Sequence, residues 1–288
     1  MRLNNLLMKL LPSLVLTLGL LANSVHAENA AKPLRVLLIT GGCCHDYAKQ
    51  KDLLKEGLEK RLNIVIDQVH SDDKTVKPPL SIYGNPEYAK GYDLIIHDEC
   101  SAGISEESVI EGVLAPHKQG IPGVNLHCAM HSYRIGNAGQ PATIGTPHGF
   151  WFEYLGLQSS GHGPQEPIAI SYLDKSDVTV KGLSDWTTVK EELYNNVKVF
   201  DSARAVAKGK QVVKKKAPKE GEPAEEEKEA IVAWTNTYKE KTRVFSTTIG
   251  HNNDTVGDDR YLDLVSRGIL WATNNLNADG TPKPAIVK

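Results

Sequence analysis

Short runs of apolar residues, each followed by small or polar residues, constrain the fold of this chain most strongly. The run LRVLLIT (34–40) is almost wholly apolar, as in a strand that is buried on both faces. Four further segments have the composition of strands: 63–69, 93–99, 121–127 and 243–250. Their alternation with helical segments predicts an α/β fold with a doubly wound, mainly parallel sheet between helices.

Helical periodicity fills the intervals between these runs. Leucines at four positions of segment 49–62 fall on one helical stripe. A second helix is expected from Ser105, which precedes two acidic residues, to Gly120, a residue type common at helix ends. Near the C-terminus a third helix is expected, with an apolar face formed by Tyr261, Leu264, Val265, Gly268, Ile269 and Ala272.

The N-terminal residues 1–27 have the pattern of a secretory signal peptide. Arg2 and Lys9 precede a run of 13 mostly apolar residues (10–22). Ala27 ends a small–x–small cleavage site. The run is shorter than the roughly 20 residues of a membrane span, and a short anchor helix is the alternative. We expect cleavage after Ala27, a linker over 28–33, and a secreted or periplasmic mature protein with no membrane attachment.

The segment 208–229 carries a basic block followed by an acidic block and has few apolar residues. Its flanks resemble strands, which predicts a β-hairpin excursion with a mobile charged loop at its tip. A docking arm for a partner is the alternative. The remaining boundaries are one domain over 34–276 and a loose tail over 277–288.

Composition excludes several classes of protein. The formal net charge is −2, which gives no electrostatic footprint for nucleic acid. Four cysteines in 288 residues are too few for a disulfide scaffold. The sequence leaves the oligomeric state open.

Reactive residues gather where the predicted strands end. In an open parallel sheet, ligands bind beyond the carboxyl ends of the strands, where the strand order reverses. Each residue alone has an ordinary core or loop role as its alternative, but four strand ends on one rim predict a pocket. The residues at these ends are Cys43, Cys44, His45 and Asp46, then His97, Asp98, Glu99 and Cys100, then His127, Cys128 and His131, and finally His251, Asn252 and Asn253.

Five of the runs resemble the ThuA-like, or trehalose-utilisation, family. They are LLITGGCCHDY (37–47), NLHCAMHSYR (125–134), SSGHGPQ (159–165), DWTTVKEELYNN (185–196) and RVFSTTIGHNN (243–253). The resemblance covers roughly residues 34–275 and implies a class I glutamine-amidotransferase-like fold, with a flavodoxin-like sheet of order 2-1-3-4-5, and a link to sugar metabolism. In that order strands one, three and four are neighbours, so we expect Cys43 or Cys44, Cys100 and Cys128, which follow or end these strands, to lie close together. One pair that includes Cys100 is expected to form a disulfide.

Nucleophilic catalysis is the first possible chemistry of this site. Cys128 follows the fourth strand, where the amidotransferase fold has its nucleophile elbow, with His251 as a possible base and Glu192 to orient it. The bulky residues Leu126 and Met130 disfavour such an elbow. His251 is followed by two asparagines, where an amidotransferase has His-x-Glu. Both departures argue against glutaminase activity.

Metal-assisted chemistry is the second possibility, with a divalent metal such as zinc as the cofactor. A catalytic zinc site needs three protein ligands and an open position. His127 and His131 share a face only if residues 127–131 are helical. Glu192 or Asp98 can add a carboxylate. The candidate imidazole ligands are His45, His127, His131, His162 and His251.

Acid–base chemistry on a sugar is the third possibility, with His45, Glu192 and His251 to move protons. The alternative for Glu192 is a solvated carboxylate at a helix start. Trp186 can join Trp151 and Tyr154 in an aromatic platform for a sugar, or all three can be core residues. The candidate substrate-binding residues are Asp46, His127, His131, Tyr133, Arg134, His162, Trp186, Tyr194 and Asn252.

These residues together favour an enzyme that acts on a sugar or modified sugar by hydrolysis, elimination or isomerisation. A non-catalytic carbohydrate-binding module is the alternative. The expected partner in either case is a small carbohydrate or a derivative of one.

Overall fold

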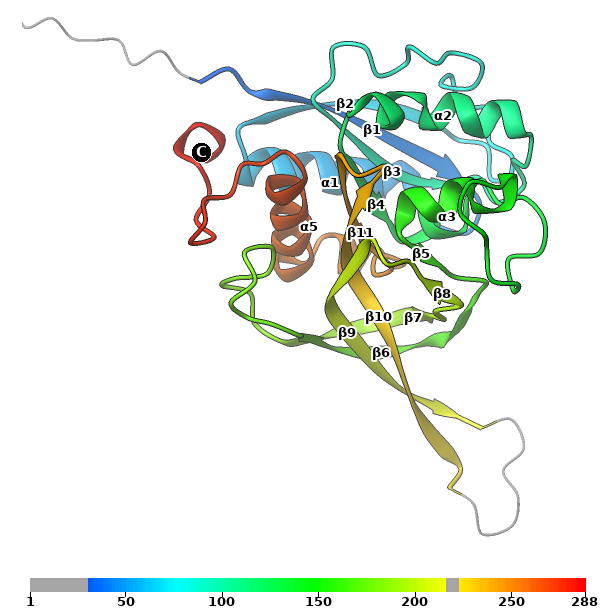
Figure 1. The fold of residues 1–288 in the computed structure, drawn as a ribbon. Helices are drawn as coiled ribbons and strands as arrows, with labels where there is room; N and C mark the ends of the chain where they lie inside the picture. The colour runs from blue at the N-terminus through cyan, green and yellow to red at the C-terminus, as the bar shows by residue number, and fades with distance from the viewer. Residues whose placement is uncertain (1–30, 216–222) are drawn as a thin grey trace, which may run out of the picture. The chain divides into compact units, whose positions relative to one another are not determined.

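A nine-stranded mixed sheet with helices on both faces forms the centre of the protein (Figure 1). The computed structural model describes residues 31–215 and 223–288. The strands are β1 (Leu34–Gly42), β2 (Ile64–Ser71), β3 (Leu94–Cys100), β4 (Gly123–Leu126), β5 (Leu157–Gln158), β6 (His162–Tyr172), β7 (Trp186–Tyr194), β8 (Lys198–Val199), β9 (Ala203–Lys214), β10 (Glu225–Tyr238) and β11 (Thr242–Thr247). The helices are α1 (Tyr47–Arg61), α2 (Glu107–Gln119), α3 (Phe150–Leu155), α4 (Asn253–Val256) and α5 (Asp259–Ala272), with 3-10 turns η1 (His127–His131), η2 (Pro147–Gly149) and η3 (Pro284–Ile286).

Five parallel strands form one half of the sheet, in the order β2-β1-β3-β4-β11. This confirms the predicted flavodoxin-like order 2-1-3-4-5, with β11 as the fifth strand. The chain leaves β1 toward β2 on one side and later returns to β3 on the other. The crevice that this reversal creates lies at the carboxyl ends of the strands, where a ligand site is expected.

Helices cover both faces of the parallel half, which explains why Val36, Leu37, Leu38 and Ile39 of β1 are apolar and buried without a break. On one face, Leu54 and Leu58 of α1 pack with Val36 and Leu38 of β1, and α5 joins the same core (Figure 1). On the other face, α2 and α3 pack over the alternate residues of β1. Helix α2 ends at Gly120, whose φ of 115° is a left-handed conformation that glycine adopts easily.

The antiparallel strands β10, β9, β6 and β7 extend the sheet, and β9 with β10 forms the predicted hairpin (Figure 1). These strands reach well into the segment 208–229, which the charge pattern predicted to be a loop. The basic and acidic blocks lie opposite each other, so that Lys208 pairs with Glu229 at 2.6 Å and Lys210 with Glu227 at 2.9 Å. Only 216–222 of that segment lie outside the described residues.

The C-terminal residues pack on the domain, in contrast to the loose tail that we expected. The Ile286 side chain is buried, and its carbonyl accepts a hydrogen bond from the Asn63 amide at 2.8 Å. The predicted signal peptide, 1–27, lies outside the described residues. No helix in the part of the chain that the structure describes is long and apolar enough to cross a membrane.

Candidate functional site

Three imidazoles meet at the carboxyl ends of β1, β4 and β11. His45 follows β1, His127 follows β4 directly, and His251 lies four residues after β11. The ring centroid of His45 is 4.7 Å from that of His127 and 4.6 Å from that of His251. One ring nitrogen from each histidine lies within 4.8 Å of the other two, as in a group that can hold a metal ion.

His127 occupies the sharp turn between β4 and η1. Its φ of 41° lies in the left-handed region, which is uncommon for a residue with a side chain. Strand β4 ends at Leu126, one residue earlier than we expected, so the strained position falls on His127 and not on Cys128. The site that an amidotransferase-like fold gives to its nucleophile therefore holds an imidazole.

The hydrogen bonds of His127 determine its tautomer. Nδ1 lies 2.6 Å from the Thr248 carbonyl oxygen, which can only accept, so Nδ1 carries the proton. Nε2 faces the Tyr194 hydroxyl at 3.3 Å and a carboxylate oxygen of Glu192 at 3.5 Å. Histidines that bind metals use this arrangement, in which one ring N–H donates to a backbone carbonyl and the other nitrogen binds the metal.

The carboxylate of Glu192 lies among these rings. Its oxygens are 3.3 Å from Nδ1 of His251 and 3.5 Å from Nε2 of both His127 and His162. Burial alone would raise the pKa of Glu192, but the imidazoles of His127 and His251 outweigh it and hold the pKa well below its usual range. Glu192 lies in strand β7 and is 6% exposed, so it is not a solvated carboxylate at a helix start.

His251 is held through both its backbone and its ring. The buried carboxylate of Glu191 accepts hydrogen bonds from the amides of Gly250, His251 and Asn252 at 3.0–3.4 Å. The ring Nε2 lies 2.8 Å from the side-chain amide of Gln165. The hydrogen bond with Glu192 raises the pKa of His251, against a smaller opposing effect of burial.

The surroundings of His45 lower its pKa, whereas those of His251 raise it. Burial, with the nearby rings of His127 and His251, lowers the pKa of His45 to about 2. The ring is therefore neutral at physiological pH, which is the form that binds metals. Its Nδ1 is buried and makes no hydrogen bond with any described residue, so a polar atom in the site lacks a partner.

His131 and His162 lie beside this group but outside it. The His131 ring stacks on Tyr194 with centroids 4.2 Å apart, and its Nε2 is 2.9 Å from the Ser159 hydroxyl. Because η1 is a 3-10 turn with about three residues per turn, His127 and His131 do not share a face. His162 contacts Glu192 at 3.5 Å and stacks on Tyr194, with ring centroids 5.5 Å apart.

Three other predicted site residues lie away from the histidine group. Tyr133 is buried and donates a hydrogen bond to Glu99 at 2.6 Å. Trp186 is at the opposite end of β7 from Glu192, with the Arg260 guanidinium over its ring. Asp98 is buried beside Thr40, and burial raises its pKa well above the usual range, so it does not offer a ligand carboxylate.

Two hydrogen bonds of polar rim residues hold the loop after β11 in place. Asp46 accepts a hydrogen bond from the Asn253 side chain at 2.9 Å, and the Asn252 side chain donates to the Lys190 carbonyl. Arg134 lies close enough to interact electrostatically with His131, Cys128 and Cys100.

The histidine group opens into a pocket of about 430 Å³, lined by Cys44, His45, Asp46, Lys74, His251, Asn252 and Asn253.

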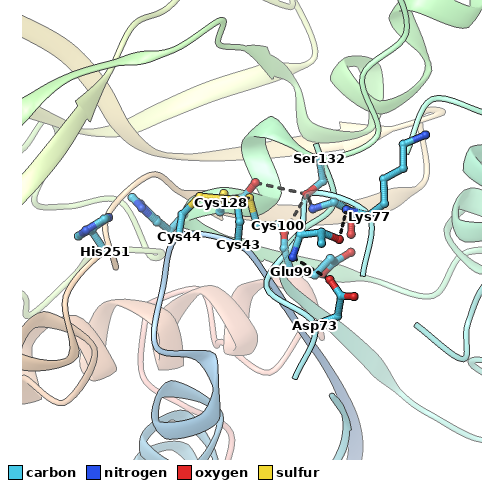
Figure 2. The surroundings of a disulfide bond; sticks show 12 residues. Cys43, Cys44, Asp73, Lys77, Glu99, Cys100, Cys128, Ser132 and His251 are labelled. Atoms are coloured by element: carbon cyan, nitrogen blue, oxygen red, sulfur yellow. Dashed lines mark hydrogen bonds between the residues drawn. A yellow bond between two sulfur atoms is a disulfide. The ribbon is translucent and has the colours of Figure 1, made fainter. Parts of the chain in front are cut away.

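The cysteines gather as we expected, but their pairing differs. Cys43 and Cys44 form a disulfide between neighbouring residues, and Cys100 lies 3.4 Å from Cys43 Sγ to Sγ (Figure 2). The expectation of a disulfide that includes Cys100 is therefore wrong. A hydrogen bond with Cys100 and burial raise the pKa of Cys128 well above its usual value, so Cys128 remains a thiol and is a poor nucleophile.

Sequence reasoning missed three residues that position His251. Glu191 and Gln165 hold its backbone and ring, and the Gln50 side chain donates to its carbonyl at 2.9 Å. Glu191 and Gln165 did fall within runs that carry the family resemblance, which was the available signal.

The fold and the histidine group define an α/β protein with a flavodoxin-like parallel sheet and a candidate metal site at its switch point. The chain belongs to the ThuA family, described as trehalose utilisation, whose model matches residues 35–272. No sequence among curated proteins matches it.

The solved structure of a ThuA-like protein shows the same fold. A crystal structure of a ThuA-like protein from Parabacteroides merdae is 20% identical, with a TM-score of 0.58, over 84% of this chain and 90% of that one. A Thermoplasma acidophilum protein described as part of a GMP synthase is 12% identical (TM-score 0.45; 83% and 96% covered). A glutamine amidotransferase from Thermotoga maritima is 11% identical (TM-score 0.38; 75% of each chain covered).

Proposed function

We propose that this protein is an enzyme that acts on a sugar or modified sugar, with a divalent metal such as zinc bound by His45, His127 and His251. The observation that carries the proposal is the convergence of three ring nitrogens within 4.8 Å, beside a buried carboxylate and below an open pocket. Three protein ligands with an open position are typical of catalytic zinc sites. Membership of a family described as trehalose utilisation supports a carbohydrate substrate.

The residues present fit a metal ion. His45 is neutral and has a buried nitrogen without a partner, and His127 has its proton on the nitrogen that faces the Thr248 carbonyl. His45 therefore offers an unprotonated nitrogen to a cation, and Nε2 of His127 belongs to the same group of ring nitrogens. A bound metal would polarise a substrate oxygen or lower the pKa of a bound water.

Glu192 serves as the proton acceptor of the site. Its lowered pKa keeps it ionised at neutral pH, so it acts as a base and not as an acid. It also holds the ring of His251 in place, with a carboxylate oxygen 3.3 Å from Nδ1. At the pocket rim, Asp46 and Lys74 offer hydrogen bonds to sugar hydroxyls.

A non-catalytic carbohydrate-binding module is less well supported. Such a module needs an exposed aromatic face, but Trp151, Tyr154 and Trp186 are all buried. We further propose that the protein acts outside the cytoplasm, after cleavage behind Ala27. This second proposal rests on the sequence pattern of residues 1–27.

The test is turnover of trehalose and its oxidised or dehydrated derivatives by the zinc-loaded protein, followed by NMR. We expect product formation that a chelator abolishes, that added zinc restores, and that His251→Ala lacks. Sugar binding without product, unaffected by the chelator, would contradict the proposal and favour the binding module.

A further inference from the structure

A cluster of cysteines lies beside the histidine site, and the proposed function uses none of it. Cys43 and Cys44 directly follow β1. Cys100 is the last residue of β3, the strand that pairs with β1. Figure 2 shows the disulfide between Cys43 and Cys44, with Cys100 and Cys128 on one side and His251 on the other. The Sγ atoms of Cys43, Cys44 and Cys100 all lie within 4.8 Å of one another.

We propose that Cys43, Cys44 and Cys100 form a second binding site, for a soft metal ion such as Zn²⁺ or Cu⁺, once the disulfide between Cys43 and Cys44 is reduced. Thiolates favour soft ions over hard ones such as Mg²⁺. Sulfurs that share one tetrahedral zinc ion at about 2.3 Å lie about 3.8 Å from one another. Sulfurs that are already within 4.8 Å reach this spacing through small side-chain movements.

The disulfide controls whether this site exists. A dithiol reductant transfers two electrons and two protons to the sulfurs of Cys43 and Cys44, which breaks their bond, and the reductant becomes a disulfide. When the metal binds, the thiols of Cys43, Cys44 and Cys100 each release a proton to solvent. Of these three cysteines, only Cys100 offers a thiol in the oxidised protein, so the site is absent.

The positions of the three cysteines suit reversible binding. Cys44 is exposed and lines the pocket of about 430 Å³, so a reductant and an ion reach it from solvent. Cys100 is buried, and it packs with Tyr47 and Cys128 on the inner side of the cluster. An apolar inner wall and an open outer side limit the approach of water while leaving a path for the ion.

The test is cadmium binding by the full chain, before and after treatment with a phosphine reductant that is then removed under anaerobic conditions. Cadmium bound to thiolates gives an ultraviolet charge-transfer band, which imidazole ligands do not give, so the histidine site does not contribute. We expect about one equivalent of cadmium to produce the band in the reduced protein and no band in the oxidised protein.

Matched variants identify the ligands. We expect Cys44→Ser and Cys100→Ser each to weaken cadmium binding at least tenfold, and Cys128→Ser to retain it. Cys44 is exposed, so Cys44→Ser keeps the test decisive if Cys100→Ser fails to fold. An equal band in the oxidised protein, an unchanged band in Cys44→Ser, or its loss in Cys128→Ser would overturn the proposal.

Discussion

The Nδ1 atom of His251 lies 3.3 Å from Oε1 of Glu192, and this contact joins the loop after β11 to strand β7. It raises the pKa of His251 above 6.5 and helps to lower that of Glu192 below 4.5. The ion pair therefore stabilises the fold fully between pH 4.5 and 6.5. This contribution is lost as the pH rises through the raised pKa of His251, or falls through the lowered pKa of Glu192.

Glu192→Gln removes the charge but keeps the shape of the side chain. We expect the pKa of His251 to fall below its value in the wild type, because its main stabilising partner is lost. An NMR titration of the His251 ring protons measures the change. Glu227→Gln, in the exposed hairpin, is the control and should leave that pKa unchanged. An unchanged His251 pKa in Glu192→Gln would show that the contact has no electrostatic effect.

Glu191 is a positioning residue for the loop that carries His251. Glu191→Ala leaves three backbone amides without their carboxylate acceptor, so we expect the free energy of unfolding to fall by about 2–4 kcal/mol. Urea unfolding measures this loss. Glu229→Ala removes an exposed ion pair and should change stability little. Equal stability of the two variants would exclude the anchoring role of Glu191.

His251 and Cys128 should differ in their importance for turnover. His251→Ala removes a metal ligand and the imidazole that Glu192 contacts, and we expect turnover to fall at least about 100-fold. Cys128 is buried with a raised pKa, so Cys128→Ser should keep turnover within about threefold, which is less than ~0.7 kcal/mol in activation free energy. Both variants are first checked for folding by circular dichroism. If Cys128→Ser is inactive while His251→Ala is active, the thiol is the catalyst.

The charged hairpin should tolerate a cut only at its tip. Replacing residues 215–224 by Asn-Gly joins Lys214 to Glu225, which already pair, and should cost less than about 1 kcal/mol. Deleting 208–229 also removes buried Val213 and the Gln211 side chain, which donates to the carbonyls of Pro164, Glu166 and Glu191.

We expect the longer deletion to cost more than about 3 kcal/mol, which is roughly 6–12 °C in the thermal midpoint of a domain of this size. Calorimetry of the two deletions side by side measures the difference. Equal midpoints would show that β9 does not support the sheet beyond its pairing with β10.

The parallel half of the fold could be predicted because its signals are local. The apolar run LRVLLIT is buried on both faces from Val36 onward, and His45, His127 and His251 follow strand ends at which the topology forms a crevice. The strand order came from the family resemblance, and the arrangement of the strands confirms it.

The finer features depend on contacts between distant segments. The residue at the strained turn is set by where β4 ends. The strand ends at Leu126, one residue earlier than predicted, so the strained turn falls on His127 and not on Cys128. The roles of Glu191 and Gln165 follow from the pairing of β6 with β7, in which Gln165 lies opposite Glu192. The disulfide joins adjacent residues, and no spacing rule favours such a pair over one that includes Cys100.

Metal analysis of the purified, oxidised protein, with zinc titration of the metal-free form, tests the central claim most directly. We expect about one zinc ion per chain in the wild type, with affinity that rises with pH as His251 loses its proton. His127→Ala should lose this zinc, while His148→Ala, with its ring beside Phe152, should keep it. Absence of zinc binding in the wild type, or full binding in His127→Ala, would contradict the metal site.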